Sequence, residues 1–321
     1  MLAGRMLRRA LLTAALGALL VASGAGAAAP SGPRLAVIVE TWKPHRINLF
    51  SVNPRGGDPL RLASGYEYEG PVQAGRVSWR SDGSEIAFQG IRSVFVARAT
   101  GGAVRELNLA DAERPVFSPD GRSLAFTRLY GPATGVWVVD LESGKQRRLL
   151  RSRRGVEYVG SSFSPDGTTL LASRIDYSRG RGGGSGETVF AVDLASGASR
   201  RLLGNGFSAV YSPDGTRLAF LRGVGKRRTG DLFVLDLATR SLRRLTRTPH
   251  KEEVYPSWDP SGERLAFVRY RRARFEWANS VHQINADGSC EKAIFAVERR
   301  VTYQAVAWQP GRGRGAGPIE C

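Results

Sequence analysis

Histidine and recognisable catalytic motifs are scarce in this 321-residue chain. The three histidines, His45, His250 and His282, are widely spaced and form no metal-ligand pattern. The nucleophile motif Gly-x-Ser-x-Gly of serine hydrolases is also missing, because the nearest match, Gly183–Glu187, has glutamate in its last place. The sequence therefore predicts neither a metal nor another cofactor, and a protein that is not an enzyme.

Long hydrophobic runs are confined to the N-terminus. Arginines at positions 5, 8 and 9 precede an apolar run over residues 11–22, and small residues follow up to Ala29. This pattern is typical of a secretory signal peptide, and the run is shorter than the roughly 20 residues that span a bilayer. We expect residues 1–29 to be cleaved, no transmembrane anchor to remain, and the mature protein to be extracytoplasmic: periplasmic, cell-surface or secreted.

Cysteine is limited to Cys290 and Cys321, both near the C-terminus. An even number of cysteines in an exported chain permits a disulfide, and two free thiols are the alternative. The tail over residues 312–321 is long enough to reach a neighbouring element. We therefore expect the pair to be bridged.

The chain repeats one motif, in which an aromatic residue is followed by Pro-Asp-Gly or a close variant and then by Leu-Ala-Phe. Successive aromatic residues are 38 to 50 positions apart (79 to 117, and 258 to 308), which is the period of a propeller blade. Five copies occupy Val77–Phe88, Val116–Phe126, Ser162–Ala172, Val210–Phe220 and Ser257–Phe267, and a sixth begins and stops within Val306–Gly311. We expect the aromatic residues to pack between blades: Trp79, Phe117, Phe163, Tyr211, Trp258 and Trp308.

Each repeat also predicts four antiparallel strands. Two form a hairpin around the Pro-Asp-Gly turn, a third is rich in β-branched residues, and the fourth is rich in arginine. The N-terminal stretch supplies three strands, at residues 35–39, 47–52 and 59–62, and lacks the first. The unpaired strand around Trp308 can complete it. The sequence therefore predicts an all-β, six-bladed β-propeller over residues 34–311, with one blade closed by both termini.

The recurring Ser-Pro-Asp-Gly and Leu-Ala-Phe segments resemble the propeller repeat of the TolB family over about residues 34 to 311. The resemblance implies a propeller that binds protein partners, as TolB engages an envelope-associated lipoprotein. Members of that family carry an α/β domain before the propeller, and residues 29–35 leave no room for one. We therefore expect a protein-binding scaffold built from the propeller alone.

The formal charge of +18 comes from 42 arginines and five lysines, which together make the 47 basic residues. Charge on outermost strands prevents edge-to-edge aggregation, which explains the following arginines: Arg61, Arg105, Arg147, Arg148, Arg200, Arg201, Arg243 and Arg244. We expect no nucleic-acid binding. We expect a monomer whose partner is an acidic, envelope-associated protein.

A second set of arginines recurs just after the second strand of four repeats: Arg128, Arg174, Arg222 and Arg269. In a propeller these positions share one face with the loops between blades. Those loops carry tyrosines, among them Tyr68, Tyr158, Tyr255 and Tyr303. Arginine and tyrosine together are typical of recognition surfaces, so we predict that this face binds the partner. The alternative is that they are ordinary solvated strand ends.

Acidic residues are the candidates for functions other than protein binding. Asp82, Asp120, Asp166 and Asp214 each precede a turn glycine, where aspartate stabilises the turn. A propeller hydrolase or lyase would need converging carboxylates, for which the interblade loops offer Glu69, Glu157 and Glu253. A sensor that binds a small ligand at the channel mouth is a further alternative.

Overall fold

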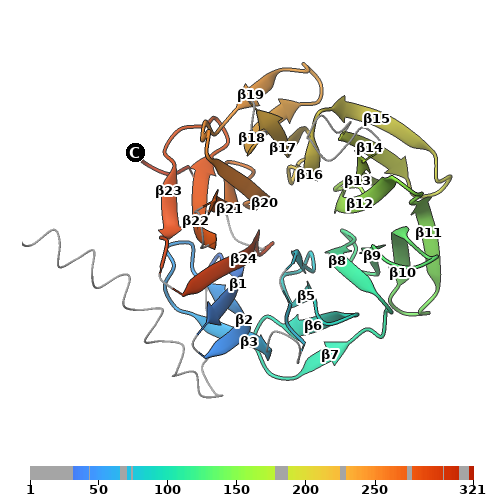
Figure 1. Cartoon of the computed structure of the whole chain (residues 1–321), viewed down its shortest axis with the longest axis horizontal. Coiled ribbons are helices and arrows are strands. Elements are labelled where there is room, and N and C mark those ends of the chain that lie inside the picture. The colour runs from blue at the N-terminus through green and yellow to red at the C-terminus, as the bar shows by residue number, and fades with distance from the viewer. Residues whose placement is uncertain are drawn as a thin grey trace, which may run out of the picture.

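The computed structural model describes residues 32–42, 44–65, 71–73, 75–177, 187–224, 229–272, 277–298, 300–310 and 318–321. The predicted signal peptide, Tyr68 and Glu69 lie outside these residues. Six four-stranded antiparallel sheets are arranged around a central axis (Figure 1). The fold is the predicted six-bladed β-propeller.

The first blade contains strands from both ends of the chain, in the order β24 (Val301–Trp308), β1 (Leu35–Trp42), β2 (His45–Val52) and β3 (Leu60–Gly65). Figure 1 shows β24 next to β1 at the inner edge of this blade. The antiparallel register runs from Leu35 opposite Trp308 to Thr41 opposite Val301. The predicted closure of the ring by the strand around Trp308 is thus confirmed.

The other five blades follow in chain order, each with its first strand innermost. Blade two contains β4 (Val77–Trp79), β5 (Glu85–Gln89), β6 (Val94–Arg98) and β7 (Val104–Glu106), and blade three contains β8 (Ala112–Phe117), β9 (Ser123–Arg128), β10 (Gly135–Asp140) and β11 (Gln146–Arg151). Blade four contains β12 (Val156–Phe163), β13 (Thr169–Asp176), β14 (Thr188–Asp193) and β15 (Ser199–Gly204). Blade five contains β16 (Phe207–Tyr211), β17 (Arg217–Val224), β18 (Thr229–Asp236) and β19 (Leu242–Arg244), and blade six contains β20 (Lys251–Trp258), β21 (Arg264–Arg272), β22 (Trp277–Asn285) and β23 (Lys292–Phe295).

The Pro-Asp-Gly turns join the first two strands of a blade. In the third blade, Oδ1 of Asp120 accepts hydrogen bonds from Ser118 Oγ at 2.6 Å and from Arg122 N at 3.0 Å. Gly121 has a φ of 67°, which a residue without a Cβ adopts at little cost. The hydrogen bond from Ser118 is the main reason that the pKa of Asp120 is lowered. The turn role predicted for these aspartates is confirmed.

The repeated aromatic residues pack between neighbouring blades. Trp79 of the second blade is 6% exposed, and its Nε1 donates to the carbonyl of Ala307 in the first blade at 3.2 Å. Trp258 of the sixth blade bonds in the same way to the carbonyl of Val210 in the fifth, also at 3.2 Å. The indoles of Trp79 and Trp258 thus each link one first strand to the first strand of the neighbouring blade, and both buried N–H groups find an acceptor.

A disulfide joins Cys290 and Cys321, with a Cα–Cα distance of 5.0 Å and 31 residues of sequence separation. The enclosed segment contains β24, the strand that closes the ring. The tail is also held by Ile319 N, which donates to Oδ1 of Asn285 at 2.7 Å. The bridge therefore ties the closing segment to the sixth blade.

Replacing both cysteines with serine should lower the free energy of unfolding by about 3 kcal/mol, because the unfolded chain then gains the entropy of an open loop. Guanidinium unfolding with and without a reducing agent measures this effect. The reductant should destabilise the wild-type protein and leave the double variant unchanged. Equal stabilities of the oxidised wild type and the double variant would contradict the prediction.

Candidate binding surfaces

The four register arginines occupy equivalent places in the structure. Each lies near the end of the second strand of its blade, and this end pairs with the beginning of the first strand. Arg174 pairs with Tyr158, and Arg269 pairs with Glu253. Since a first strand starts at the connection from the preceding blade and ends at the Pro-Asp-Gly turn, these arginines lie on the interblade face. The Pro-Asp-Gly turns lie on the opposite face.

Two of the register arginines contact the connection between blades. Nε of Arg128 donates to the carbonyl of Ala110 at 2.9 Å, and Nε of Arg222 donates to the carbonyl of Asn205 at the same distance. The Arg128 guanidinium lies 4.5 Å from the ring centroid of Trp137. Burial lowers the pKa of both arginines. Part of the arginine register is therefore explained by stacking and by the need to satisfy backbone carbonyls.

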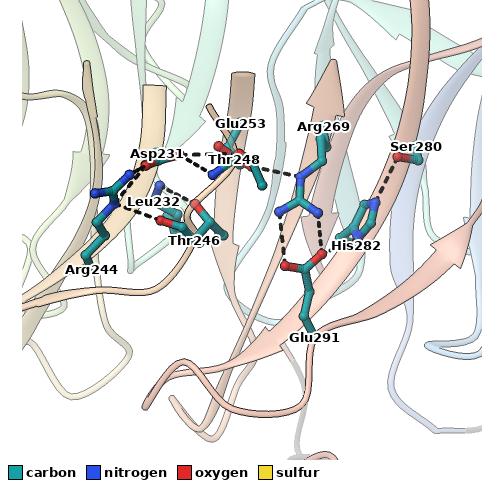
Figure 2. Close-up of polar contacts among 10 residues, drawn as sticks. All are labelled: Asp231, Leu232, Arg244, Thr246, Thr248, Glu253, Arg269, Ser280, His282 and Glu291. Carbon is teal, nitrogen blue, oxygen red and sulfur yellow. Dashed lines mark hydrogen bonds and ion pairs between the residues drawn. The ribbon is translucent and has the colours of Figure 1, made fainter. Parts of the chain in front are cut away.

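Arg269 lies in the interior of the sixth blade, in contrast to the predicted surface position. Its side chain is 6% exposed and that of Glu253 is 0% exposed, and Nε of Arg269 donates to Glu253 at 2.8 Å. Both Nη atoms contact the carboxylate of Glu291 (Figure 2). Two carboxylates thus hold this guanidinium, because a buried cation without a partner would be costly.

The buried network continues on both sides of Arg269. On one side, Nδ1 of His282 lies 2.8 Å from Glu291. On the other, Thr248 donates to Glu253 at 2.8 Å and also contacts Asp231, as Figure 2 shows. Although burial raises the pKa of Glu291, the hydrogen bonds from His282 and Arg269 outweigh it and lower this pKa to about 2. Glu291 is thus ionised at neutral pH, as its role as an ion-pair partner requires.

Arg174 and Tyr158 line one hollow on the interblade face. The hollow has a volume of about 360 Å³ and also includes Arg151 and Arg153. Arg174 is held in place by its Nη2, which donates to Asp176 at 2.8 Å, and its side chain is 29% exposed. The structure therefore brings together one predicted arginine and one predicted tyrosine on an accessible surface.

A second hollow lies beside the first and shares Arg153 with it. Its volume is about 270 Å³, and it includes Arg128, Arg154, Glu157 and Tyr177. The hydroxyl of Tyr177 donates to Glu157 at 3.1 Å. We call the two hollows together the arginine–tyrosine surface, which consists of Arg128, Arg151, Arg153, Arg154, Tyr158, Arg174 and Tyr177.

The repeat pattern does not predict three of the exposed arginines of this surface. Arg151, Arg153 and Arg154 lie at and after the end of β11, in the connection to β12. Arg151 has a counterpart in the fifth blade alone, Arg247, and Arg153 has none, so a comparison of repeats does not single out this group. The signal that could have found them is the local run Arg-Ser-Arg-Arg-Gly at residues 151–155.

The remaining predicted tyrosines lie away from the arginine–tyrosine surface. Tyr303 is 0% exposed and packs with Phe295, at a centroid distance of 5.3 Å, so the predicted surface position is wrong. Tyr303 lies in β24 of the first blade and packs against apolar residues of the sixth blade, where a large apolar group fills the space. Tyr255 lines the central channel instead of the interblade face. Tyr68 lies outside the described residues.

The acidic candidates do not converge. Glu157 lines the second hollow of the arginine–tyrosine surface, and Glu253 belongs to the buried network around Arg269. Within the described ranges, no group of three or more His, Cys, Asp or Glu side chains is placed to hold a metal ion. In the same ranges, no helix is long and apolar enough to cross a membrane.

A family model described as the TolB beta propeller domain matches residues 111–312. The chain belongs to the TolB β-propeller family. The Tol-Pal system protein TolB of Anaeromyxobacter dehalogenans (strain 2CP-C) is 29% identical over 209 residues, which cover 54% of this chain and 45% of that protein. The TolB of Francisella tularensis subsp. mediasiatica is 23% identical over 245 residues, which cover 73% of this chain and 53% of the relative.

The solved structure of TolB from Acinetobacter baumannii has the same fold. Its TM-score is 0.70 at 19% identity, over 86% of this chain and 66% of that chain. A putative TolB from Agrobacterium tumefaciens follows with a TM-score of 0.62 at 15% identity, over 87% and 99% of the two chains. This chain spans about half the length of the curated TolB relatives described above.

Proposed function

We propose that this chain is an exported, non-catalytic propeller that acts as a protein-binding scaffold in the cell envelope or outside the cell. Its relatives are named as proteins of the Tol-Pal system, and its N-terminus has the composition of a signal peptide. The observation that carries the proposal is the arginine–tyrosine surface, where five arginines line two adjoining hollows.

The chemistry of this surface favours an acidic partner. Five arginines and one acidic residue, Glu157, line the two hollows. Asp176 pairs with Arg174, and Asp111 and Glu187 lie near Arg128 and Tyr177, so the arginines still exceed the carboxylates in number. Arginine binds carboxylates through two parallel hydrogen bonds, and tyrosine adds contact area at a low entropic cost. Such charge complementarity also accelerates association. A partner with clustered aspartate or glutamate side chains would therefore fit the surface, and the propeller would bind it as a monomer.

Reversal of charge at three exposed positions tests the proposal. The variant Arg151→Glu, Arg153→Glu and Arg154→Glu should lower the recovery of the crosslinked partner from the native envelope at least tenfold, because each reversal replaces attraction with repulsion. The measurement is quantitative mass spectrometry of the proteins crosslinked to the purified propeller.

The matched control carries the same change in charge on outermost strands, at positions outside the arginine–tyrosine surface, as Arg61→Glu, Arg105→Glu and Arg200→Glu. All three control positions are exposed. The control should recover the partner as the wild type does. If both variants lose it equally, the interaction depends on net charge and not on this surface, and equal recovery by all three proteins would reject the surface outright.

A further inference from the structure

Arg76 extends its side chain into the central channel of the propeller. It directly precedes β4 in the second blade, and its Nη1 donates to the carbonyl of Ser161 in the fourth blade. The contact passes over the third blade, which lies between these two in the ring (Figure 1). The guanidinium therefore lies across the channel and not between two packed sheets.

The charge of Arg76 has no carboxylate partner among the described residues. The carbonyl of Ser161 is the acceptor that the structure shows. Burial by the surrounding protein and, to a smaller extent, the nearby positive charge of Arg114 together lower the pKa of Arg76 to about 10. The group remains a cation at neutral pH. A desolvated cation beside a second cation is costly unless an anion joins them.

The surface of Arg76 that remains open faces a cavity of about 470 Å³ within the channel. Above Arg76 the walls are mainly apolar, with aromatic residues from five blades: Trp79, Phe163, Tyr211, Trp258 and Trp308. Arg76 precedes Trp79 by three residues, so it lies about 10 Å deeper along the strand direction. The cavity thus combines an apolar wall with a cationic floor.

The mouth of the cavity lies at the Pro-Asp-Gly turns. It is lined by prolines that follow the first strands, namely Pro119, Pro165, Pro213, Pro260 and Pro310. Asp259 also lines the cavity, but its carboxylate is 0% exposed and lies 3.5 Å from Nε of Arg264. The negative charge of Asp259 is therefore paired with Arg264. It does not compensate the positive charge of Arg76.

We propose that the central channel binds a carboxylate carried on an apolar stem. The guanidinium of Arg76 binds the carboxylate at the floor, where Arg114 adds positive charge, and the aromatic wall receives the stem. The hydroxyl of Tyr255, which also lines the cavity, is an additional donor near Arg76. The site opens on the face opposite the arginine–tyrosine surface, so it does not depend on the partner proposed above.

Titration calorimetry with hexanoate and hexan-1-ol tests the proposal on the wild-type protein. The two probes share the stem and differ in charge, so hexanoate should bind at least tenfold more tightly. The tryptophans in the wall give a second signal, because their fluorescence should change as the stem enters. Equal affinities for the two probes, or no binding of hexanoate, would overturn the proposal.

Variants then locate the contact. Arg76→Gln should weaken hexanoate binding at least tenfold and leave hexanol binding unchanged, because a charge-assisted hydrogen bond is lost while the wall remains. Arg200→Gln removes an exposed charge from an outermost strand and should behave as the wild type. If Arg76→Gln binds hexanoate as tightly as the Arg200→Gln control, Arg76 is not the floor contact and the proposal fails.

A competition experiment separates two sources of the carboxylate, a small organic acid and the C-terminus of a peptide. The probe is a leucine-rich tetrapeptide, either with a free C-terminus or amidated. Competition with hexanoate by the free form alone would assign the site to a chain terminus, and failure of both forms to compete would assign it to a small acid. Equal competition by both peptide forms would contradict recognition of a carboxylate.

Discussion

Replacing Arg269 with alanine is expected to lower the free energy of unfolding by about 3 to 5 kcal/mol, the usual result of removing one partner from a buried ion pair. The loss arises because Glu253, whose side chain is 0% exposed, would be left without its cation. Burial already raises the pKa of Glu253 even with Arg269 present. Guanidinium unfolding monitored by fluorescence measures the change.

The matched control is Arg222→Ala. Arg222 has the same place in its blade, but its acceptors are the carbonyls of Asn205 and Gly204, and no carboxylate among the described residues pairs with it. Its removal should cost about 1 kcal/mol. A double variant, Arg269→Met with Glu253→Gln, should recover part of the lost stability, since both charges of the most deeply buried pair are then removed together. Equal losses for Arg269→Ala and Arg222→Ala would contradict the role of the ion pairs.

Tyr303→Ala should also lower the free energy of unfolding by about 3 to 5 kcal/mol, the range for deleting a large buried aromatic side chain. Tyr303 is fully buried in β24. Its ring stacks on Phe295, and its backbone N–H donates to Oδ1 of Asn279 at 2.7 Å. A cavity at this point would loosen the strand that closes the ring, and thermal and guanidinium unfolding both report that change.

Tyr303→Phe serves as the control, because it keeps the ring and removes the hydroxyl, which donates to Glu298 at 3.4 Å. This long contact should contribute less than about 1 kcal/mol. Partner capture by Tyr303→Phe should match that of the wild type. If Tyr303→Ala instead folded with full stability and lost only partner capture, the predicted surface role would be right and the buried placement would be wrong.

The fold could be predicted because it is repeated in the sequence. Each copy of the aromatic residue, the Pro-Asp-Gly turn and the following strand specifies the same local hairpin, and the spacing between copies is too long for a shorter solenoid repeat. The incomplete first blade and the unpaired strand around Trp308 then predict ring closure, since an open array would leave exposed strand edges. These predictions depend on local sequence motifs that recur in several copies of the repeat.

The candidate site could be predicted only in part, because equivalent positions meet different neighbours. Arg174 pairs with Asp176 and borders an open hollow, whereas Arg269 is enclosed by Glu253 and Glu291. The two arginines occupy equivalent positions in the repeat, but the repeat does not predict which acidic residues face them. The second acid of the enclosed pair, Glu291, comes from a different part of the blade, after the third strand.

By itself the sequence determined the propeller, its closure by both termini and the turn chemistry, since these follow from patterns within a single blade. The tertiary structure decided which arginines are exposed, that Tyr303 is buried and that Arg76 crosses the channel to Ser161. The contacts of Arg269 with Glu253 and of Arg76 with Ser161, for example, join residues that are 16 and 85 positions apart. A repeat fixes the backbone of every blade alike, but the side chains brought together by ring closure decide burial and charge compensation.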